Sequence, residues 1–109
     1  MTTTRRREAG ELPPEHGARF VLERLDGEVG RARYEVRIEA PARGSEANHA
    51  VRGVATIRSA SDVVLGAWDG APEPWAVDTA LGVCRTLGKN HAEHGDWPGV
   101  LRRWRAPRT

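Results

Sequence analysis

Residues 31–39 alternate without a break between charged and apolar side chains, and no other stretch constrains the fold as strongly. The even positions are Ala32, Tyr34, Val36 and Ile38, and every odd position is arginine or glutamate. Because neighbouring side chains of a β-strand point to opposite faces, a period of two predicts a strand. The charges at all odd positions also predict that one face of the sheet is open to water.

Three further segments have the composition of strands. Residues 19–25 are rich in strand formers and end at Asp26 and Gly27, a pair typical of tight hairpin turns. Residues 50–58 alternate again, and residues 63–68 form a short apolar run of the kind found in more deeply buried strands. Short links between strands favour antiparallel pairing over parallel crossovers. The sequence therefore predicts a four-stranded antiparallel β-meander.

Residues 75–90 have the spacing of a core-facing helix of about four turns. Its apolar stripe consists of Val77, Leu81 and Cys84, with Ala80, Val83 and Leu87 beside it. Gly82 and Gly88 each weaken a helix by roughly 1 kcal/mol relative to alanine, so packing against the sheet must hold it.

A second, short helix is predicted at the C-terminus. Gly95 marks a break, and Asp96 is placed to cap the helix that follows. The apolar residues Trp97, Val100, Leu101 and Trp104 recur there at the i, i+3, i+4 and i+7 positions. We therefore expect an α+β fold in which two C-terminal helices pack on one face of the four-stranded sheet.

The chain is long enough for one hydrophobic core, since a chain of 109 residues can bury roughly two thirds of its unfolded surface. Residues 1–18 contain few apolar side chains and are expected to form a disordered arm. The single domain is expected at residues 19–105, with a loop at residues 40–49 and a flexible tail at residues 106–109.

The cysteine content and the hydropathy of the chain indicate the cellular compartment in which it folds. Cys84 is the single cysteine, so the chain has no intramolecular disulfide of the kind that small secreted domains often need. No apolar run reaches 18 residues, and Arg5–Arg7 are followed by Glu8 and Glu11 rather than by the apolar stretch of a signal peptide. We therefore expect a cytoplasmic protein that does not enter a membrane.

Charge is unevenly distributed along the chain. Only Lys89 of the 17 basic residues is a lysine. Such an arginine bias is typical of GC-rich coding and weakens any argument for nucleic acid from arginine content alone. Residues 59–78 contain acids and no base, whereas residues 97–109 contain arginines and no acid. These segments either face each other or each face a partner.

The residues that could carry chemistry are few. Cys84, His91 and His94 have a spacing that matches no standard zinc site, which needs four groups converging at about 2.0–2.3 Å. Cys84 and His91 would lie about 10 Å apart along a helix axis, too far for a nucleophile and its base. Glu35 and Glu39 share a strand face with arginines, which favours salt bridges over acid–base catalysis. We therefore expect no catalytic residue, no cofactor and no metal site.

These observations favour a small non-enzymatic interaction domain that acts through protein–protein contacts, with self-association as a homodimer included. The candidate interaction surface consists of Trp97, Arg102, Arg103, Trp104, Arg105, Asp69 and Glu73. An alternative is a nucleic-acid-binding module that uses the arginine-rich termini, including Arg5–Arg7. A third interpretation is an enzyme with a site around Cys84 and His91.

Overall fold

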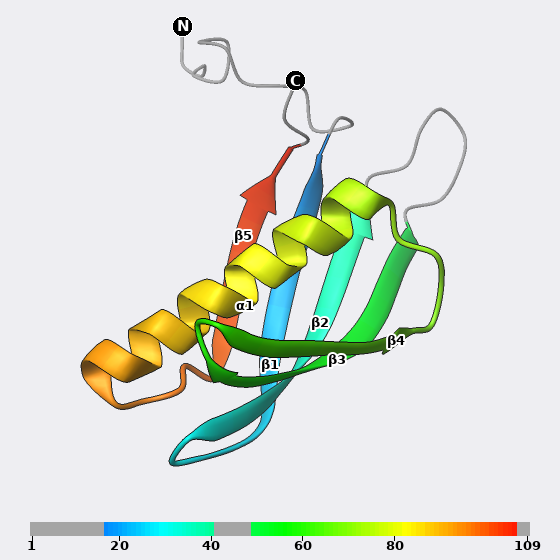
Figure 1. Cartoon of the computed structure of the whole chain (residues 1–109). Helices are drawn as coiled ribbons and strands as arrows, with labels where there is room; N and C mark the ends of the chain where they lie inside the picture. The colour runs from blue at the N-terminus through cyan, green and yellow to red at the C-terminus, as the bar shows by residue number, and fades with distance from the viewer. Residues whose placement is uncertain (1–16, 41–48, 107–109) are drawn as a thin grey trace, which may run out of the picture.

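A five-stranded antiparallel sheet and one helix make up residues 17–40 and 49–106, the part of the chain that the structure describes (Figure 1). In chain order, the elements of this computed structural model are β1 (Ala18–Glu28), β2 (Arg31–Ala40), β3 (His49–Ser59), β4 (Asp62–Trp68), α1 (Pro74–His94) and β5 (Val100–Arg105). The strand order is β4-β3-β2-β1-β5, and α1 crosses one face of the sheet (Figure 1). The α+β class is confirmed, whereas the prediction of four strands and two helices is wrong.

Parts of the predicted domain organisation lie outside the described residues. The predicted arm at residues 1–18, the predicted loop at residues 40–49 and the predicted tail at residues 106–109 fall almost wholly there. Ala18 is described, and it is already a buried residue of β1. Among the described residues, no helix combines the length and the hydropathy needed to cross a membrane.

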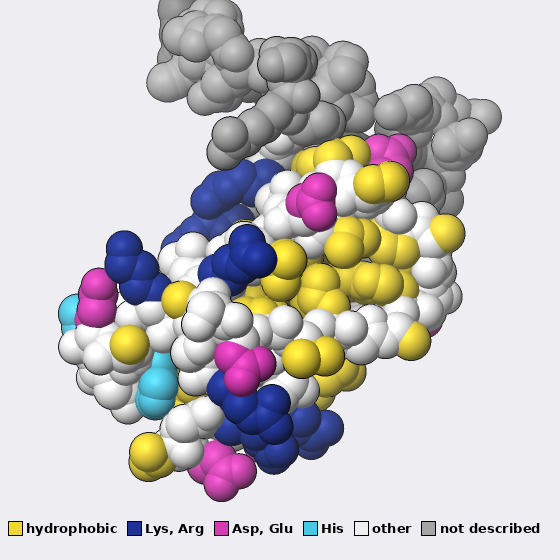
Figure 2. Space-filling model, in the orientation of Figure 1, with side chains coloured by type: hydrophobic (Ala, Val, Ile, Leu, Met, Phe, Trp, Pro, Cys, Tyr) yellow, Lys and Arg dark blue, Asp and Glu magenta, His cyan; other side chains and the backbone are white. Residues whose placement is uncertain are grey.

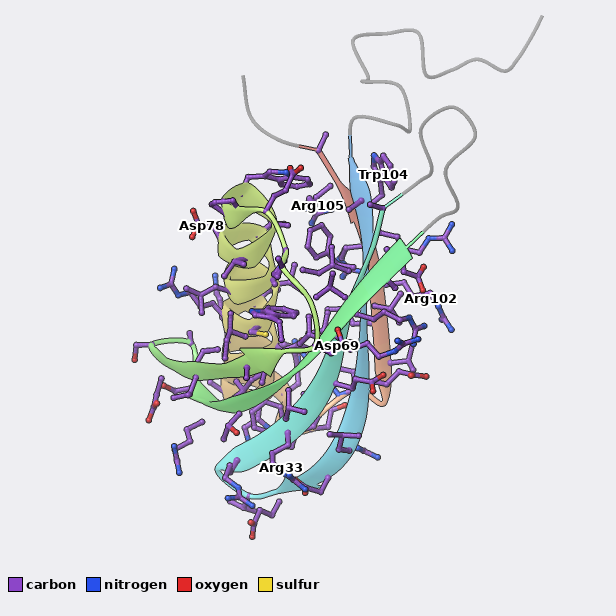
Figure 3. All side chains as sticks on the ribbon, turned by 90° about the vertical axis from the view of Figure 1, so that its right-hand side faces the viewer. Arg33, Asp69, Asp78, Arg102, Trp104 and Arg105 are labelled. Atoms are coloured by element: carbon purple, nitrogen blue, oxygen red, sulfur yellow. The ribbon has the colours of Figure 1, made fainter. Side chains whose placement is uncertain are left out.

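β2 has the amphipathic arrangement that its alternating sequence predicts. Ala32, Tyr34 and Val36 are fully buried, and their side chains face α1. The arginine and glutamate side chains between them lie on the opposite face, where no described element covers the sheet (Figure 3). Because β2 pairs with β1 on one side and with β3 on the other, it sets the orientation of the whole sheet.

The first hairpin turn is not at the predicted position. β1 continues through Asp26 and Gly27, with a bulge after Arg24, and the chain reverses after Glu28. Gly30 has a φ of 88°, the left-handed conformation that a tight turn requires and that glycine adopts without strain. Gly27 instead leaves room for Trp97, because a Cβ atom there would lie 3.2 Å from Trp97 Cδ1.

The helix is longer than predicted, and its buried side is rotated by about one position. It begins with Pro74 in its first turn and ends at Gly95, whose N–H donates to the carbonyl of His91 at 2.7 Å. The predicted stripe residues Val77 and Leu81 are only half-buried. The buried residues of α1 are Ala76, Ala80, Val83, Cys84, Leu87 and Gly88.

A close approach at Gly88 accounts for this rotation. A Cβ atom at Gly88 would lie 2.5 Å from the carbonyl carbon of Ser59 and 2.6 Å from the backbone nitrogen of Ala60. The helix can therefore contact the β3–β4 turn only with a glycine facing it. This contact favours the rotation in which Ala76 and Ala80, rather than Val77 and Leu81, face the core.

The predicted second helix is instead an extended connection followed by β5. Its four apolar residues do not form a stripe: Trp97 is buried, Leu101 lies opposite Leu22 of β1, and Trp104 is 43% exposed. Strand formation allows the backbone of Val100–Arg105 to pair with the free edge of β1. The helical spacing of these residues does not lead to a helix, because hydrogen bonding to β1, a strand far away in the sequence, outweighs the local pattern.

The side chain of Trp97 holds the connection between α1 and β5 against the first hairpin. Its Nε1 donates to the carbonyl of Glu28 at 2.9 Å. One face of its ring stacks on His91 with 3.9 Å between ring centroids, and its edge meets Tyr34 at 6.5 Å. The predicted contact residue Trp97 thus belongs to the core.

Backbone carbonyls of the connection are also bonded to β1 and β2. Arg24 Nη1 donates to the carbonyl of Trp97 at 2.6 Å, and the Arg24 backbone N–H donates to the carbonyl of Gly99 at 2.9 Å. The Tyr34 hydroxyl donates to the carbonyl of Pro98 at 2.5 Å. These bonds direct the chain to the edge of the sheet, where β5 begins.

We predict opposite effects for two alanine substitutions in α1. Gly88→Ala is expected to destabilise the fold by about 2 kcal/mol or more, because the new methyl group would overlap the backbone of the β3–β4 turn. Gly82→Ala is the matched control and is expected to stabilise by about 0.5–1 kcal/mol, since a Cβ there meets no atom within 4 Å. Urea unfolding followed by circular dichroism measures both. Equal effects would show that α1 does not approach the turn.

We also predict that Tyr34→Phe loosens β5 selectively. The substitution leaves the carbonyl of Pro98 without its donor, at an expected cost of about 1–2 kcal/mol. Amide hydrogen exchange is expected to accelerate more at Leu101 and Arg103 than in β2 and β3. A uniform acceleration across all strands would mean that the Tyr34 hydroxyl stabilises the fold without holding β5.

Candidate functional site

β5 is one edge of the described sheet, with β1 as its sole neighbour in the strand order. Because the N–H of Arg24 in β1 donates to the carbonyl of Gly99, the odd-numbered residues that follow also direct their backbone groups toward β1. The even-numbered residues Val100, Arg102 and Trp104 therefore direct their N–H and C=O groups away from the sheet. These groups form a hydrogen-bonding edge that another strand can extend.

Two arginines of β5 cover part of this edge. Arg103 Nη1 donates to the carbonyl of Arg102, and Arg105 Nη1 donates to the carbonyl of Trp104, each at 2.8 Å. Both bonds are exposed to water, so each contributes little to stability. Long charged side chains of this kind protect exposed edges from pairing with unrelated strands.

β5 presents different side chains on its two sides. The register with β1 places its odd-numbered residues on the helix side and its even-numbered residues on the uncovered side. Figure 3 shows Arg105 toward α1 and Arg102 on the opposite side. On the uncovered side, Trp104 is 43% exposed and Val100 is 40% exposed. Tryptophan and arginine are the residue types most enriched where protein interfaces derive their affinity.

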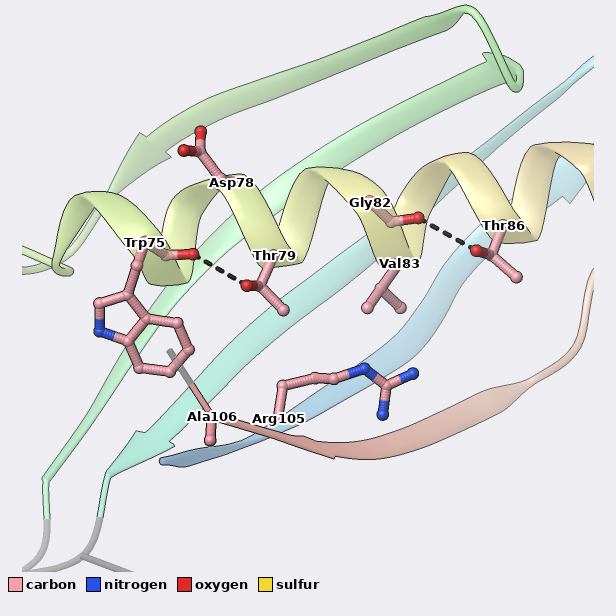
Figure 4. Close-up of a pocket in the computed structure, with 8 residues that line it drawn as sticks. All are labelled: Trp75, Asp78, Thr79, Gly82, Val83, Thr86, Arg105 and Ala106. Carbon is pink, nitrogen blue, oxygen red and sulfur yellow. Dashed lines mark hydrogen bonds between the residues drawn. The ribbon is translucent and has the colours of Figure 1, made fainter. Parts of the chain in front are cut away.

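A groove of about 590 Å³ lies between β5 and α1 on the helix side (Figure 4). Its lining residues are Trp75, Asp78, Thr79, Gly82, Val83, Thr86, Arg105 and Ala106. Arg105 extends between the two elements, whereas Asp78 projects from the other side of the helix, away from Arg105 (Figure 4). The groove lining therefore combines apolar side chains with two threonines, one guanidinium group and, at its margin, one carboxylate.

The hydroxyls of the groove are already used as donors. Thr79 Oγ1 donates to the carbonyl of Trp75 at 2.9 Å, and Thr86 Oγ1 donates to the carbonyl of Gly82 at 3.1 Å. The indole N–H of Trp75 donates to Glu73 Oε1 at 2.6 Å. A molecule in the groove would thus meet threonine lone pairs as acceptors and Arg105 as its charged donor.

On the uncovered face, Arg37 lies among three glutamates. Its Nε lies 2.6 Å from Glu39 Oε2, and its Nη1 lies 3.6 Å from Glu23 and 3.7 Å from Glu35. The hydrogen bond with Glu39 raises the pKa of Arg37. Glu23 and Glu35 are direct cross-strand partners, an unfavourable pair of like charges that Arg37 offsets.

A second apolar region lies on the helix side, at the opposite end of the sheet. Figure 2 shows hydrophobic side chains gathered between α1 and β4. β4 contributes Val63, Leu65 and Trp68, which are partly buried against the core. Trp68 is seated on Gly53 of β3, where a Cβ atom would lie 2.9 Å from Trp68 Cε3.

The structure places the predicted interaction residues in three separate locations. Arg102, Arg103, Trp104 and Arg105 lie together on β5, and Trp97 is 7% exposed in the core. Asp69 and Glu73 lie in the connection between β4 and α1. β4 is the other edge of the described sheet.

Both acids are already engaged there. Asp69 Oδ1 accepts from the backbone N–H of Arg52 at 2.7 Å, and Glu73 accepts from Trp75. β4 and β5 are opposite edges of the sheet, so Asp69 lies far from the arginines of β5, whereas Asp78 of the acidic segment lines the same groove as Arg105 of the basic segment.

The residues proposed for catalysis or metal binding are not brought together. Cys84 is fully buried, and burial raises the pKa of its thiol to about 12. His91 stacks on Trp97, and its Nδ1 lies 3.3 Å from the carbonyl oxygen of Asp96. Within residues 17–40 and 49–106, no group of three or more His, Cys, Asp or Glu side chains could hold a metal ion.

The sequence pattern indicated the arginines and Trp104 as candidates but predicted neither the strand that presents them nor the groove beside it. The groove depends on how α1 crosses the sheet, which no local pattern encodes. The available signal was weak: Pro98 biases the preceding Trp97 toward an extended backbone, and Gly99 lowers helix propensity.

Comparisons of the chain with protein-family models, with curated proteins and with solved structures find no match. The functional argument therefore rests on the β5 edge, the groove beside it and the uncovered face.

We predict that Cys84 makes the fold sensitive to alkali. The usual pKa of a cysteine is 9.0, and that of Cys84 is raised to about 12 in the folded chain. Between these values the unfolded chain loses the thiol proton and the folded chain keeps it, so the free energy of unfolding falls by about 1.4 kcal/mol per pH unit.

Tyr34 adds to this loss above pH 10, because burial raises the pKa of Tyr34 from 10.0 to about 12. Cys84→Ala is expected to lower stability at pH 7 but to remove its share of the alkaline slope, measured by urea unfolding at pH 7 to 10.5. An unchanged slope in Cys84→Ala would contradict the assignment. Thiol reagents at pH 8 are expected to modify wild-type Cys84 only as fast as the chain unfolds.

Proposed function

We propose that this chain is a small, non-enzymatic, cytoplasmic domain that binds another protein. The observation that carries the proposal is the edge of β5. Its outward backbone groups lie beside exposed Trp104 and three arginines on a strand without acidic residues. A strand edge supplies main-chain hydrogen bonds to an extended partner, and the flanking side chains select the partner. The free, buried Cys84 fits a reducing compartment.

The arrangement of charge favours a protein over a nucleic acid. Arg37 lies among three glutamates, and Arg33 donates to Asp26 at 2.6 and 2.8 Å, which lowers the pKa of that carboxyl. A surface built for phosphates would not place carboxylates at its centre. Arg5–Arg7, which the nucleic-acid alternative requires, lie outside the described residues.

An enzymatic role has less support from the geometry. The thiol of Cys84 stays protonated near neutral pH, and His91 is held against Trp97. Without a thiolate and a nearby base, nucleophilic catalysis by this pair has no activated group. This third interpretation would therefore need a different set of residues.

Site-specific photocrosslinking tests the proposal. Benzoylphenylalanine replaces Trp104 in the full chain, and in a control it replaces Val29, which is 98% exposed at the hairpin tip. Irradiation in native lysate, with and without nuclease, is expected to yield a discrete protein adduct from position 104 alone. The adduct is expected to survive nuclease. Adducts only to nucleic acid, or equal labelling from both positions, would reject a protein-binding role for β5.

A further inference from the structure

We propose that the β5 edge binds an extended segment of a partner protein that carries acidic side chains on both of its faces. This inference rests on the proposed function and specifies the partner's chemistry. The partner segment would add a sixth strand next to β5, with its helix-side residues at the mouth of the groove between β5 and α1.

The backbone geometry restricts the occupant to an extended chain. Val100, Arg102 and Trp104 present outward groups at every second residue, a repeat of about 6.6–6.8 Å. Only another strand has donors and acceptors at the same repeat, whereas a helix satisfies its own backbone groups.

The arginines of β5 specify charge on both faces of that segment. Arg102 lies on the uncovered side, and Arg103 and Arg105 lie on the helix side. Directly opposite residues of paired strands share a face, so carboxylates opposite these arginines can form bidentate pairs. β5 itself contains no acidic residue that would compete for them.

The same arginines can switch from covering the edge to holding the partner. In the free chain, Arg103 and Arg105 donate to the carbonyls of Arg102 and Trp104. An incoming strand would supply its own N–H donors to those carbonyls, which releases both guanidinium groups for the partner's carboxylates. The exchange keeps every donor and acceptor satisfied.

The remaining positions of β5 specify apolar partners. Val100 and Trp104 are exposed on the uncovered side, and Leu101 is half-buried on the helix side. An antiparallel strand in register with Arg105 to Val100 would therefore have the pattern acidic, apolar, acidic, acidic, apolar, apolar. This pattern is the partner's predicted signature.

A second copy of this chain is a poorer occupant. Two β5 strands paired about a two-fold axis would bring their arginines together without a carboxylate between them. The β4 edge of another copy has an acid only at its start, Asp62, and pairing β4 to β5 would build an open-ended chain of molecules. Charge complementarity thus favours an acidic segment of a different protein.

A peptide carrying this pattern is the probe. The peptide contains Glu-Leu-Glu-Glu-Val-Val between Ser-Gly flanks and a fluorescein label, and its binding to the full chain is followed by fluorescence polarisation. In NMR spectra of the chain, the backbone amide chemical shifts of Val100, Arg102 and Trp104 are expected to change on peptide binding. A peptide with lysine in place of glutamate is expected to bind at least about tenfold more weakly, since like charges then face each other.

A third peptide separates strand pairing from general charge attraction. It keeps the glutamates but is N-methylated at the two positions opposite Arg102 and Trp104, which removes the N–H groups that would bond to β5. A loss of about tenfold or more is expected. Equal affinity for the methylated peptide would overturn the proposal, because attraction alone would then explain binding.

Charge-reversal variants locate the site. Arg103→Glu with Arg105→Glu is expected to abolish binding, whereas Arg58→Glu, an exposed arginine on β3, is expected to leave it unchanged. Circular dichroism confirms that each variant is folded. If the Arg103, Arg105 double variant binds the peptide as tightly as the wild-type chain, the peptide binds elsewhere and the proposal is overturned. The proposal is also overturned if a single-stranded oligonucleotide binds at the same residues more tightly than the peptide.

The two proposals can fail separately. If the peptide does not bind but position 104 still crosslinks to a protein in the presence of nuclease, the acidic-strand inference is wrong and the protein-binding role stands. If position 104 crosslinks to a second copy and sedimentation shows a dimer, the occupant is the chain itself. If neither peptide nor protein is captured, both proposals are rejected.

Discussion

The burial of Trp97 between the first hairpin and the end of α1 is the interaction on which the shape of the candidate site depends. Its indole donates to Glu28 and stacks on His91, while Arg24 bonds to its carbonyl. The bonds to Glu28 and Arg24 join residues 69 and 73 positions apart, so they form only when the first hairpin and the end of the helix are brought together. They direct the chain after α1 onto the edge of β1, and that placement makes a six-residue segment the outer strand β5.

α1 covers one face of the sheet, and it packs differently near the two edges of that sheet. α1 packs mainly over β3 and β4, where Gly88 contacts the turn between them. On the β5 side the helix and the strand diverge and leave the groove lined by Trp75 and Arg105. The edge whose backbone groups face away from the described sheet is thus also the edge beside the groove.

The uncovered face of the sheet carries side chains of both charges, and one arginine lies between carboxylates of two strands. Arg37 contacts three glutamates on two strands and offsets the opposition of Glu23 and Glu35. This cluster of four side chains carries one positive and three negative charges. Of the arginines of β5, only Arg102 lies on this face, and Arg103 and Arg105 lie on the helix side. The proposed acidic partner would therefore be attracted to both sides of the strand.

The sequence by itself determined the β2 strand, the two faces of the sheet and a helix over residues 75–90. These features follow from periods of two and 3.6 residues, which are local. The tertiary structure alone decided that Val100–Arg105 is a strand, that Trp97 is buried and that a groove lies beside Arg105. Those outcomes depend on the free edge of β1 and on the path of α1, and no local pattern encodes a contact between residues so far apart in the chain.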